Sequence, residues 1–351
     1  MFKMKARRCL VIIKYNDKDI STDLQQYLKN VSYTDNISGE ADDLQLTLED
    51  KAGLWQSAWM PEKGATLDVS VKLINWQSIG KQVVRFGLFE IDEITSSGMP
   101  SEVQIKAVSV PDNNNLRGAE RTRSWEKAEL KRIANDIATE AGLTLYYDVK
   151  EYNPVIDRAE QTEQSDLSFL YKLCADHGLA LKICDKQMVI FDEADYEAAE
   201  AVALVPKPKA SYSAGSLKVV DMLKSYSLRS KVRDVYKSCH VKYQDSSTKQ
   251  KIEATFTAPD KQIGKTLEVN EQVASIADAE RLAKKKLREK NSDEVTGNFS
   301  FLGNPELVAA VNIQLSGFGA FDGKYIITKA QHDIGDGYTT SIDVRRCLDG
   351  Y

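Results

Sequence analysis

The amino-acid sequence predicts a mainly β protein with an α+β part, in which two barrel-like antiparallel β domains flank a small α+β module. Three observations lead to this prediction. Short segments that alternate apolar and polar residues dominate the two ends of the chain, as is typical of half-buried strands. The middle of the chain instead has apolar residues at helical spacing. The 351-residue chain is also too long for one ordinary domain, since domains average about 150 residues.

The first predicted domain, residues 1–115, is a barrel-like β domain. Its strand-like segments are separated by turn residues such as Ser38-Gly39, which is typical of a small antiparallel barrel or sandwich. The stretch from Asp19 to Leu28 is the exception and predicts one or two helical turns. The predicted strands are Cys9–Tyr15, Val31–Asp35, Leu44–Leu48, Leu67–Leu73, Phe86–Ile94 and Val103–Val108.

Residues 116–205 are predicted to form the small α+β module. Apolar residues at Leu130 and at offsets 3, 4, 7, 8 and 11 from it define one face of a helix. Ser124 is a candidate N-cap of this helix, and Gly142 is a candidate C′ residue in a Schellman ending. A second helix is predicted between an N-cap at Ser165 and a C′ residue at Gly178. Strands are predicted at 143–148, 179–184 and 188–191.

The third predicted domain, residues 206–351, is a second barrel-like β domain with a helix near 276–290. The latter part of the Ala-, Pro- and Ser-rich stretch at 194–216 is interpreted as a linker. Ser275 and Asp278 have the spacing of a capping-box-like helix start. Strands are predicted at 235–243 and 251–256, which could form a hairpin, and at 311–315, 324–329 and 339–345.

Charge and hydropathy argue against several classes of protein. The 47 basic and 52 acidic residues give a net charge of −5, which disfavours non-specific DNA binding because that affinity comes from neutralising phosphates. No apolar run approaches the roughly 20 residues that cross a bilayer. The apolar run Cys9–Ile13 is also shorter than the about 7–15 residues of a signal-peptide core. We therefore expect no membrane segment, no signal peptide, no specific nucleic-acid binding, and synthesis in the cytoplasm.

Few residues are candidates for chemistry, and the sequence predicts no catalytic, cofactor-binding or metal-binding residues. The five cysteines are odd in number and form no CxxC, which indicates a reducing compartment. Cys174 and His177 have a spacing that can share a metal, but Cys174 falls on the apolar helix face and His177 suits the helix C-terminus. His332 lies on or beside a predicted strand, which favours a structural role.

Two further motifs have structural explanations. The glycines of 317–323 lie between two predicted strands, whereas a phosphate loop needs a helix directly after it. The basic cluster of Lys284, Lys285, Lys286, Arg288 and Lys290 has acidic residues on both sides and predicts a solvated helix face, with partner binding as the alternative. A long, well-patterned chain without a convergent site is more typical of an assembly component than of an enzyme.

Motifs in three ordered stretches cover nearly the whole chain. The first stretch is 39–50, followed by Trp55, Gly64 and 87–93. The second is 158–173 with 178–182 and has the form Q-x-x-x-S-D-x-x-F-L-x-x-L … G-L. The third is 317–332 with 337–345 and has the form G-K-Y … H … G-Y-T-T … R. Together they resemble the phage late-control gene D protein family, the baseplate hub of contractile phage tails. Ala309-Ala310 departs from the Pro-Gly or Ala-Gly that the family usually has before this strand.

The resemblance implies a structural, non-enzymatic hub in the tail baseplate of a contractile phage or a phage-tail-like particle. Such hubs are trimers whose six barrels around a three-fold axis adapt a hexameric tail tube to a trimeric spike, and their fold resembles the base of the type VI secretion tip protein. The implied partners are two further copies of the chain, the tail tube protein, the spike protein and other baseplate proteins. DNA could pass through the ring, which would suit an acidic lumen.

Three alternatives remain open from the sequence. The chain could be a tail-tip protein of a non-contractile phage, or the hub of a defective-prophage particle such as a bacteriocin, because the architecture would be similar. It could also be a tail-associated cell-wall hydrolase. The three hub-like stretches leave no separate block of the chain for a lytic domain, which argues against the hydrolase.

Overall fold

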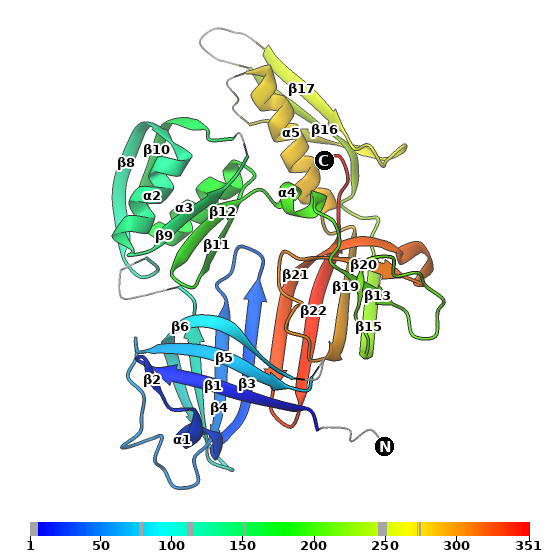
Figure 1. The fold of residues 1–351 in the computed structure, drawn as a ribbon. Coiled ribbons are helices and arrows are strands. Elements are labelled where there is room, and N and C mark those ends of the chain that lie inside the picture. The colour runs from blue at the N-terminus through cyan, green and yellow to red at the C-terminus, as the bar shows by residue number, and fades with distance from the viewer. Residues whose placement is uncertain are drawn as a thin grey trace. The chain divides into compact units, whose positions relative to one another are not determined.

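The structure is a computed structural model, and it describes residues 6–76, 80–110, 116–150, 152–244, 251–271, 273 and 275–351 (Figure 1). Strands account for 50% of the chain and helices for 16%, which confirms the mainly β class. The chain divides into two compact units: unit 1 is Met1–Asp192, Phe301–Ala309 and Lys329–Ser341, and unit 2 is Glu193–Ser300, Ala310–Thr328 and Ile342–Tyr351. The predicted boundary at 115/116 adjoins residues 111–115, which lie outside the described residues, as do residues 1–5.

The N-terminal part of unit 1 is built from strands that confirm the predicted ones. β6 pairs with β5 through its first half and with β7 through its second half, so it joins a front sheet (β1, β5, β6) to a back sheet (β3, β4, β7). The predicted helical turns are α1. The elements are β1 (Arg8–Tyr15), β2 (Lys18–Asp19), α1 (Ser21–Gln25), β3 (Leu28–Asn36), β4 (Asp43–Glu49), β5 (Thr66–Ile74), β6 (Lys81–Ser97) and β7 (Glu102–Val108).

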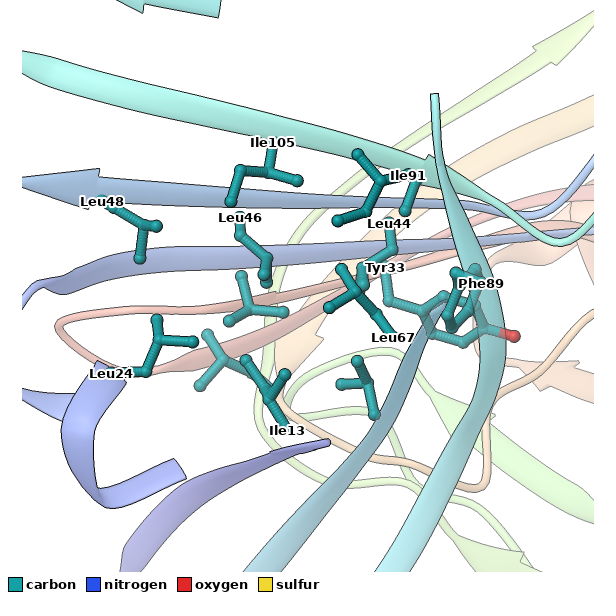
Figure 2. Close-up of a cluster of buried hydrophobic side chains, with 14 of the residues drawn as sticks. Ile13, Leu24, Tyr33, Leu44, Leu46, Leu48, Leu67, Phe89, Ile91 and Ile105 are labelled. Atoms are coloured by element: carbon teal, nitrogen blue, oxygen red, sulfur yellow. The ribbon is translucent and has the colours of Figure 1, made fainter. Parts of the chain in front are cut away.

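The core of these two sheets follows from the alternation of the sequence. Every second residue of β4 and β5 is buried, and the intervening residues face outward. Figure 2 shows these side chains meeting between the sheets, with Ile13 and Leu67 on one side and Leu46 and Ile105 on the other. The described strands form no closed barrel, because β1 pairs on its outer edge only at Lys14 and Tyr15, with β2.

The α+β module also belongs to unit 1. A three-stranded sheet (β11-β12-β9) and a two-stranded ribbon (β8, β10) accompany two helices whose apolar faces fill a second core. Because β12 runs parallel to β9, this sheet is mixed. The elements are β8 (Glu120–Glu129), α2 (Leu130–Glu140), β9 (Thr144–Asp148), β10 (Val155–Ser165), α3 (Asp166–Asp176), β11 (Ala180–Cys184) and β12 (Gln187–Phe191).

The predicted helix ends of the module are right in three places and wrong in one. Ser165 Oγ accepts a hydrogen bond from Ser168 N at 3.3 Å, as an N-cap does. Gly142 and Gly178 have φ of 65° and 72°, and the amide after each glycine bonds to a carbonyl five residues back, which is the Schellman pattern. Ser124 is not an N-cap, because its segment is β8, paired with β10, and α2 begins only at Leu130.

The sheet of unit 2 is mixed rather than antiparallel as predicted, because β13 runs parallel to both of its neighbours, β14 and β20. β13 lies within the stretch interpreted in part as a linker, and Ala203, Leu204 and Val205 are buried there. The elements are α4 (Glu193–Ala198), β13 (Ala203–Pro206), β14 (Lys218–Val219), β15 (Leu223–Ser230), β19 (Val295–Leu302), β20 (Asn312–Ser316), the 3₁₀ turn η1 (Gly319–Phe321), β21 (Gly323–Ile334) and β22 (Tyr338–Arg346). Parts of β19, β21 and β22 belong to unit 1, namely the residues within 301–309 and 329–341.

A second sheet of unit 2, in the order β17-β16-β18, packs against the helix α5. β16 (Tyr236–Gln244) and β17 (Lys251–Thr257) are antiparallel, which confirms the predicted hairpin pairing, and β18 (Lys265–Val269) is parallel to β16. α5 (Ile276–Asn291) confirms the predicted helix, and its N-cap Ser275 accepts a hydrogen bond from Asp278 N at 3.1 Å. Within the described residues, every helix is too short or too polar to cross a membrane.

Candidate functional site

His332 lies in β21 and is completely buried. Its Nδ1 is 2.8 Å from the hydroxyl of Tyr338 and 3.1 Å from Oγ1 of Thr340, and its ring stacks on Tyr33 with centroids 5.9 Å apart. Burial lowers the pKa of His332 to about 4, so the ring is neutral at pH 7. A buried neutral imidazole with two hydroxyl partners fits the structural role that the sequence predicts.

The other two histidines have local partners of their own. His177 Nδ1 lies 3.1 Å from the hydroxyl of Tyr152, and the neighbouring Cys174 is buried in the module core with its pKa raised to about 12 by burial. A protonated, buried thiol is a poor metal ligand. His240 lies 2.8 Å from a carboxylate oxygen of Glu268. In the described part of the chain, no three His, Cys, Asp or Glu side chains gather as a metal site would require.

Unit 1 contains a buried ion cluster that we call the Lys182 cluster, made of Lys182, Asp35 and Asp42. Lys182 Nζ contacts Asp35 Oδ1, lies 3.0 Å from Asp42 Oδ1, and donates to the carbonyl of Asn36 at 2.6 Å. Burial alone would lower the pKa of Lys182, but the two carboxylates outweigh it and raise the pKa. Burial also raises the pKa of Asp42. The cluster fastens β11 of the module to the end of β3.

Two further hydrogen bonds extend the Lys182 cluster. Asp42 Oδ1 accepts from Asn36 N at 2.9 Å, which closes the loop between β3 and β4. Asp35 Oδ2 accepts from Ala309 N at 2.9 Å, so a segment far along the chain is held at the same place. The cluster therefore joins segments of unit 1 that are distant in sequence.

A second buried cluster of unit 1 lies where β10 meets α3. Gln161 donates to Asp166 Oδ1 at 2.7 Å and accepts from Arg123 Nε at 2.9 Å, and Arg123 Nη2 donates to Asp166 at 2.7 Å. Arg123 also bonds to Glu140 at the end of α2, at 2.9 Å. This network fixes the start of α3 relative to β8, β10 and α2.

Unit 2 also contains a buried ion cluster, centred on Glu197 in α4. The Glu197 side chain is almost completely buried. It contacts Arg345 Nη1, lies 2.5 Å from Arg288 Nη2, and accepts from Leu348 N at 2.8 Å. Arg345 also contacts Glu193 at 2.6 Å. The cluster joins α4, α5 and β22, and it accounts for Arg288, one member of the predicted basic cluster.

Two lysines of the basic cluster and the glycine-rich motif have local partners of their own. Lys286 pairs with Glu271 at 2.8 Å, and Lys284 lies over the ring of Phe256 at 5.9 Å. The glycines of 317–323 form the turn between β20 and β21, where Gly317, Gly319 and Gly323 have positive φ. The amide of Phe318 donates to Asp322 at 2.6 Å, so a side chain of the turn itself occupies this donor.

The comparison with protein families supports the sequence resemblance. A family described as phage tail baseplate hub (GPD) matches residues 92–338, which is more than half of the chain. The chain belongs to the phage tail baseplate hub family. This membership confirms the expectation drawn from the ordered motifs, and it places the protein among components of the phage virion baseplate.

Hub proteins are also found among the relatives of this chain. A probable baseplate hub protein of Escherichia phage P2 is 30% identical over 167 residues, which are 48% of this chain and 41% of that protein. The match therefore spans less than half of the relative's length.

Solved structures share the hub-family fold over most of the chain. The 43 kDa tail protein of prophage MuSo2 from Shewanella oneidensis has a TM-score of 0.69 at 15% identity, over 97% of this chain and 99% of that one. An E. coli component of the type VI secretion system, described as similar to the T4 tail proteins gp27 and gp5, has a TM-score of 0.55 at 12% identity, over 93% and 75%. The likeness to a type VI secretion component is thus confirmed at the level of the fold.

The motifs that led to the hub family correspond to the buried clusters. Gln161 and Asp166 come from its Q-x-x-x-S-D signature, His332 and Tyr338 from its closing pattern, and Lys182 follows its G-L motif. The sequence did not predict that Lys182 pairs with Asp35 and Asp42. A lysine between the apolar residues Leu181 and Ile183 fits the alternation of a half-buried strand, which predicts an exposed side chain, so the sequence held no signal of this pairing.

Proposed function

We propose that this chain is a structural, non-enzymatic baseplate hub of a contractile phage tail or phage-tail-like particle. Three copies form a ring that adapts the hexameric tail tube to the trimeric spike. Family membership supports the hub assignment. The partners of the ring are the tube protein, the spike protein and other baseplate proteins, and assembly takes place in the host cytoplasm before the virion is complete.

The observation that carries the ring proposal is that one chain divides into two compact units, each of which contains β-sheet. Three chains then contribute six β units, which is the number of subunits in one ring of a hexameric tube. Head-to-tail contacts between copies close such a ring, because each copy uses two different surfaces. Closure also covers strand edges that would otherwise promote aggregation.

Two finer features complete the proposal. The chain is organised as a barrel-like β domain at 1–115, an α+β module at 116–205 and a second barrel-like β domain at 206–351. The ring encloses a lumen through which DNA can pass, and an acidic lining would keep the DNA from sticking. The chemistry of the described histidines supports a non-enzymatic role, because His332 is buried and neutral and is bonded to Tyr338 and Thr340.

The solution mass of the purified chain tests the ring. With 39.3 kDa per chain, light scattering over a concentration series should give three times that mass. Negative-stain images of the same sample should show a central pore. A monomer at every concentration contradicts a ring that assembles by itself, and cleavage of purified cell wall by the sample would favour the hydrolase instead.

A further inference from the structure

The outer face of the front sheet in unit 1 has an unusual composition. The strand register places four rows of three residues on this face, one each from β1, β5 and β6: Arg8, Ile74 and Lys81; Leu10, Lys72 and Val83; Ile12, Ser70 and Arg85; Lys14, Asp68 and Leu88. The alternate residues of β5, such as Val71, are buried between the sheets. We call the outward set the basic–apolar face.

Apolar and basic side chains each supply five of the twelve positions of the basic–apolar face. Val83, near its middle, is 58% exposed. Arg85 is paired with Asp68 at 2.9 Å and also contacts Asp185. Among the described residues, Arg8, Lys72 and Lys81 have no carboxylate within 4.0 Å, so much of the positive charge is uncompensated within the chain.

The back sheet of the same unit provides an internal comparison. Its outward positions on β4 are Asp43, Gln45, Thr47 and Glu49, and those on β7 include Glu102, Gln104 and Lys106. These seven positions are all polar, with three acidic residues and one basic residue, as expected for a surface in contact with water. The apolar residues of the basic–apolar face are therefore not a general property of the fold, and such patches commonly mark interaction surfaces.

The edge of the sheet beside the basic–apolar face is open. Asn16 N donates to Thr66 O at 2.9 Å, so the even-numbered residues of β1 direct their main-chain groups toward β5. The odd-numbered residues direct theirs to the other edge, where Ile20 N and Ser21 Oγ bond to Ile13. Farther along, at Cys9 and Val11, no described strand pairs with this edge. A cavity of about 450 Å³ adjoins it.

We propose that the basic–apolar face, with the open edge of β1, is the surface by which one copy of this chain binds an acidic surface of a neighbouring copy. The inference rests on the proposed ring and names one of the two surfaces that close it. Charge complementarity favours a second copy, because the chain as a whole has a net charge of −5 although this face is basic. The apolar positions and open main-chain groups favour a protein partner over a nucleic acid.

Two double variants with the same change in charge test this inference. Lys72→Glu/Lys81→Glu reverses the basic–apolar face, whereas Arg132→Glu/Lys172→Glu makes the same change on the exposed surfaces of α2 and α3. Mass is measured by light scattering over protein and salt concentrations, and folding by thermal melting. We expect Lys72→Glu/Lys81→Glu to weaken trimer association at least about tenfold, while the control variant remains a trimer. Val83→Asp, a single exposed substitution, should weaken association in the same direction.

The possible outcomes separate this inference from the ring itself. If the wild type is a trimer and all variants remain trimeric, the ring stands and the assignment of this face is overturned. If the control variant dissociates equally, the effect is one of net charge and the assignment is also overturned. A wild type that is monomeric throughout instead contradicts the proposed ring. DNA binding that is lost in Lys72→Glu/Lys81→Glu while its mass is unchanged would show that the face serves a nucleic acid.

Discussion

The buried polar residues at the motif positions connect segments of the chain that are distant in sequence. Each has polar partners from other elements, as most buried polar groups do. The partners of Lys182 are two carboxylates and a carbonyl, and those of Gln161 are a carboxylate and a guanidinium. The partners of His332 are two hydroxyls. Loss of any one leaves its partners buried with fewer hydrogen bonds, which is costly.

His332 should make stability depend on pH. Its pKa of about 4 in the folded chain lies below the ordinary value of 6.5, so the unfolded chain takes up the proton first as the pH falls. Its contribution is complete above pH 6.5, declines between pH 6.5 and 4, and is lost below that. The difference between the two pKa values corresponds to about 3 kcal/mol in the free energy of unfolding. Urea unfolding of wild type and His332→Gln across this range should show a shallower slope for the variant, and equal slopes would refute the assignment.

Removal of Lys182 should be costly because it leaves Asp35 and Asp42 buried without their cation. We expect Lys182→Met to reduce the free energy of unfolding by about 3–5 kcal/mol. Lys172, exposed on α3, supplies the control, and Lys172→Met should stay within about 0.5 kcal/mol of wild type. Urea denaturation of both measures the difference. If Lys182→Met is as stable as Lys172→Met, the Lys182 cluster is not a significant source of stability.

Among the elements, those with a strong local pattern were predictable from the sequence and those that depend on distant partners were not. Most strands of the first domain alternate apolar and polar residues, β1 contains a short apolar run, and the face of α2 has helical spacing, so their types were evident. β8 was missed because its residues, including Arg121, Arg123 and Glu126, are mostly polar, and only pairing with β10 makes the segment a strand. β13 was missed because its residues are buried on both faces, which removes the alternation.

The contrast between Ser165 and Ser124 allows a test of helix capping at the start of α3. Both serines precede an apolar helical pattern, but only Ser165 caps a helix, by accepting from Ser168 N. We expect Ser165→Ala to reduce the free energy of unfolding by about 1 kcal/mol. Ser124→Ala, exposed within β8, should change it by less than about 0.5 kcal/mol. Chemical denaturation of the two variants decides the matter, and equal losses would contradict the capping role.

At the scale of the whole molecule, each unit is assembled from segments that are distant in sequence. Unit 1 combines the N-terminal residues with 301–309 and 329–341, and β21 pairs through Lys329–Ile334 with β3. Periodicity locates β21 in the sequence but does not identify its partner, because the register is set by burial and not by chain order. The discontinuity of the units was therefore beyond what the sequence could predict.

The five thiols, spread over both units, give a prediction for the assembled protein. Burial raises the pKa of Cys9, Cys174 and Cys347 to about 12 and that of Cys184 and Cys239 to about 11, and all five are free. At pH 8 even the lower value leaves only about one thiolate in a thousand, so reaction and disulfide exchange are slow. The solution mass should be the same with and without reductant, and iodoacetamide should label all five thiols only after unfolding. A mass that falls when reductant is added would show that a disulfide, and not the surface of the fold, holds the copies together.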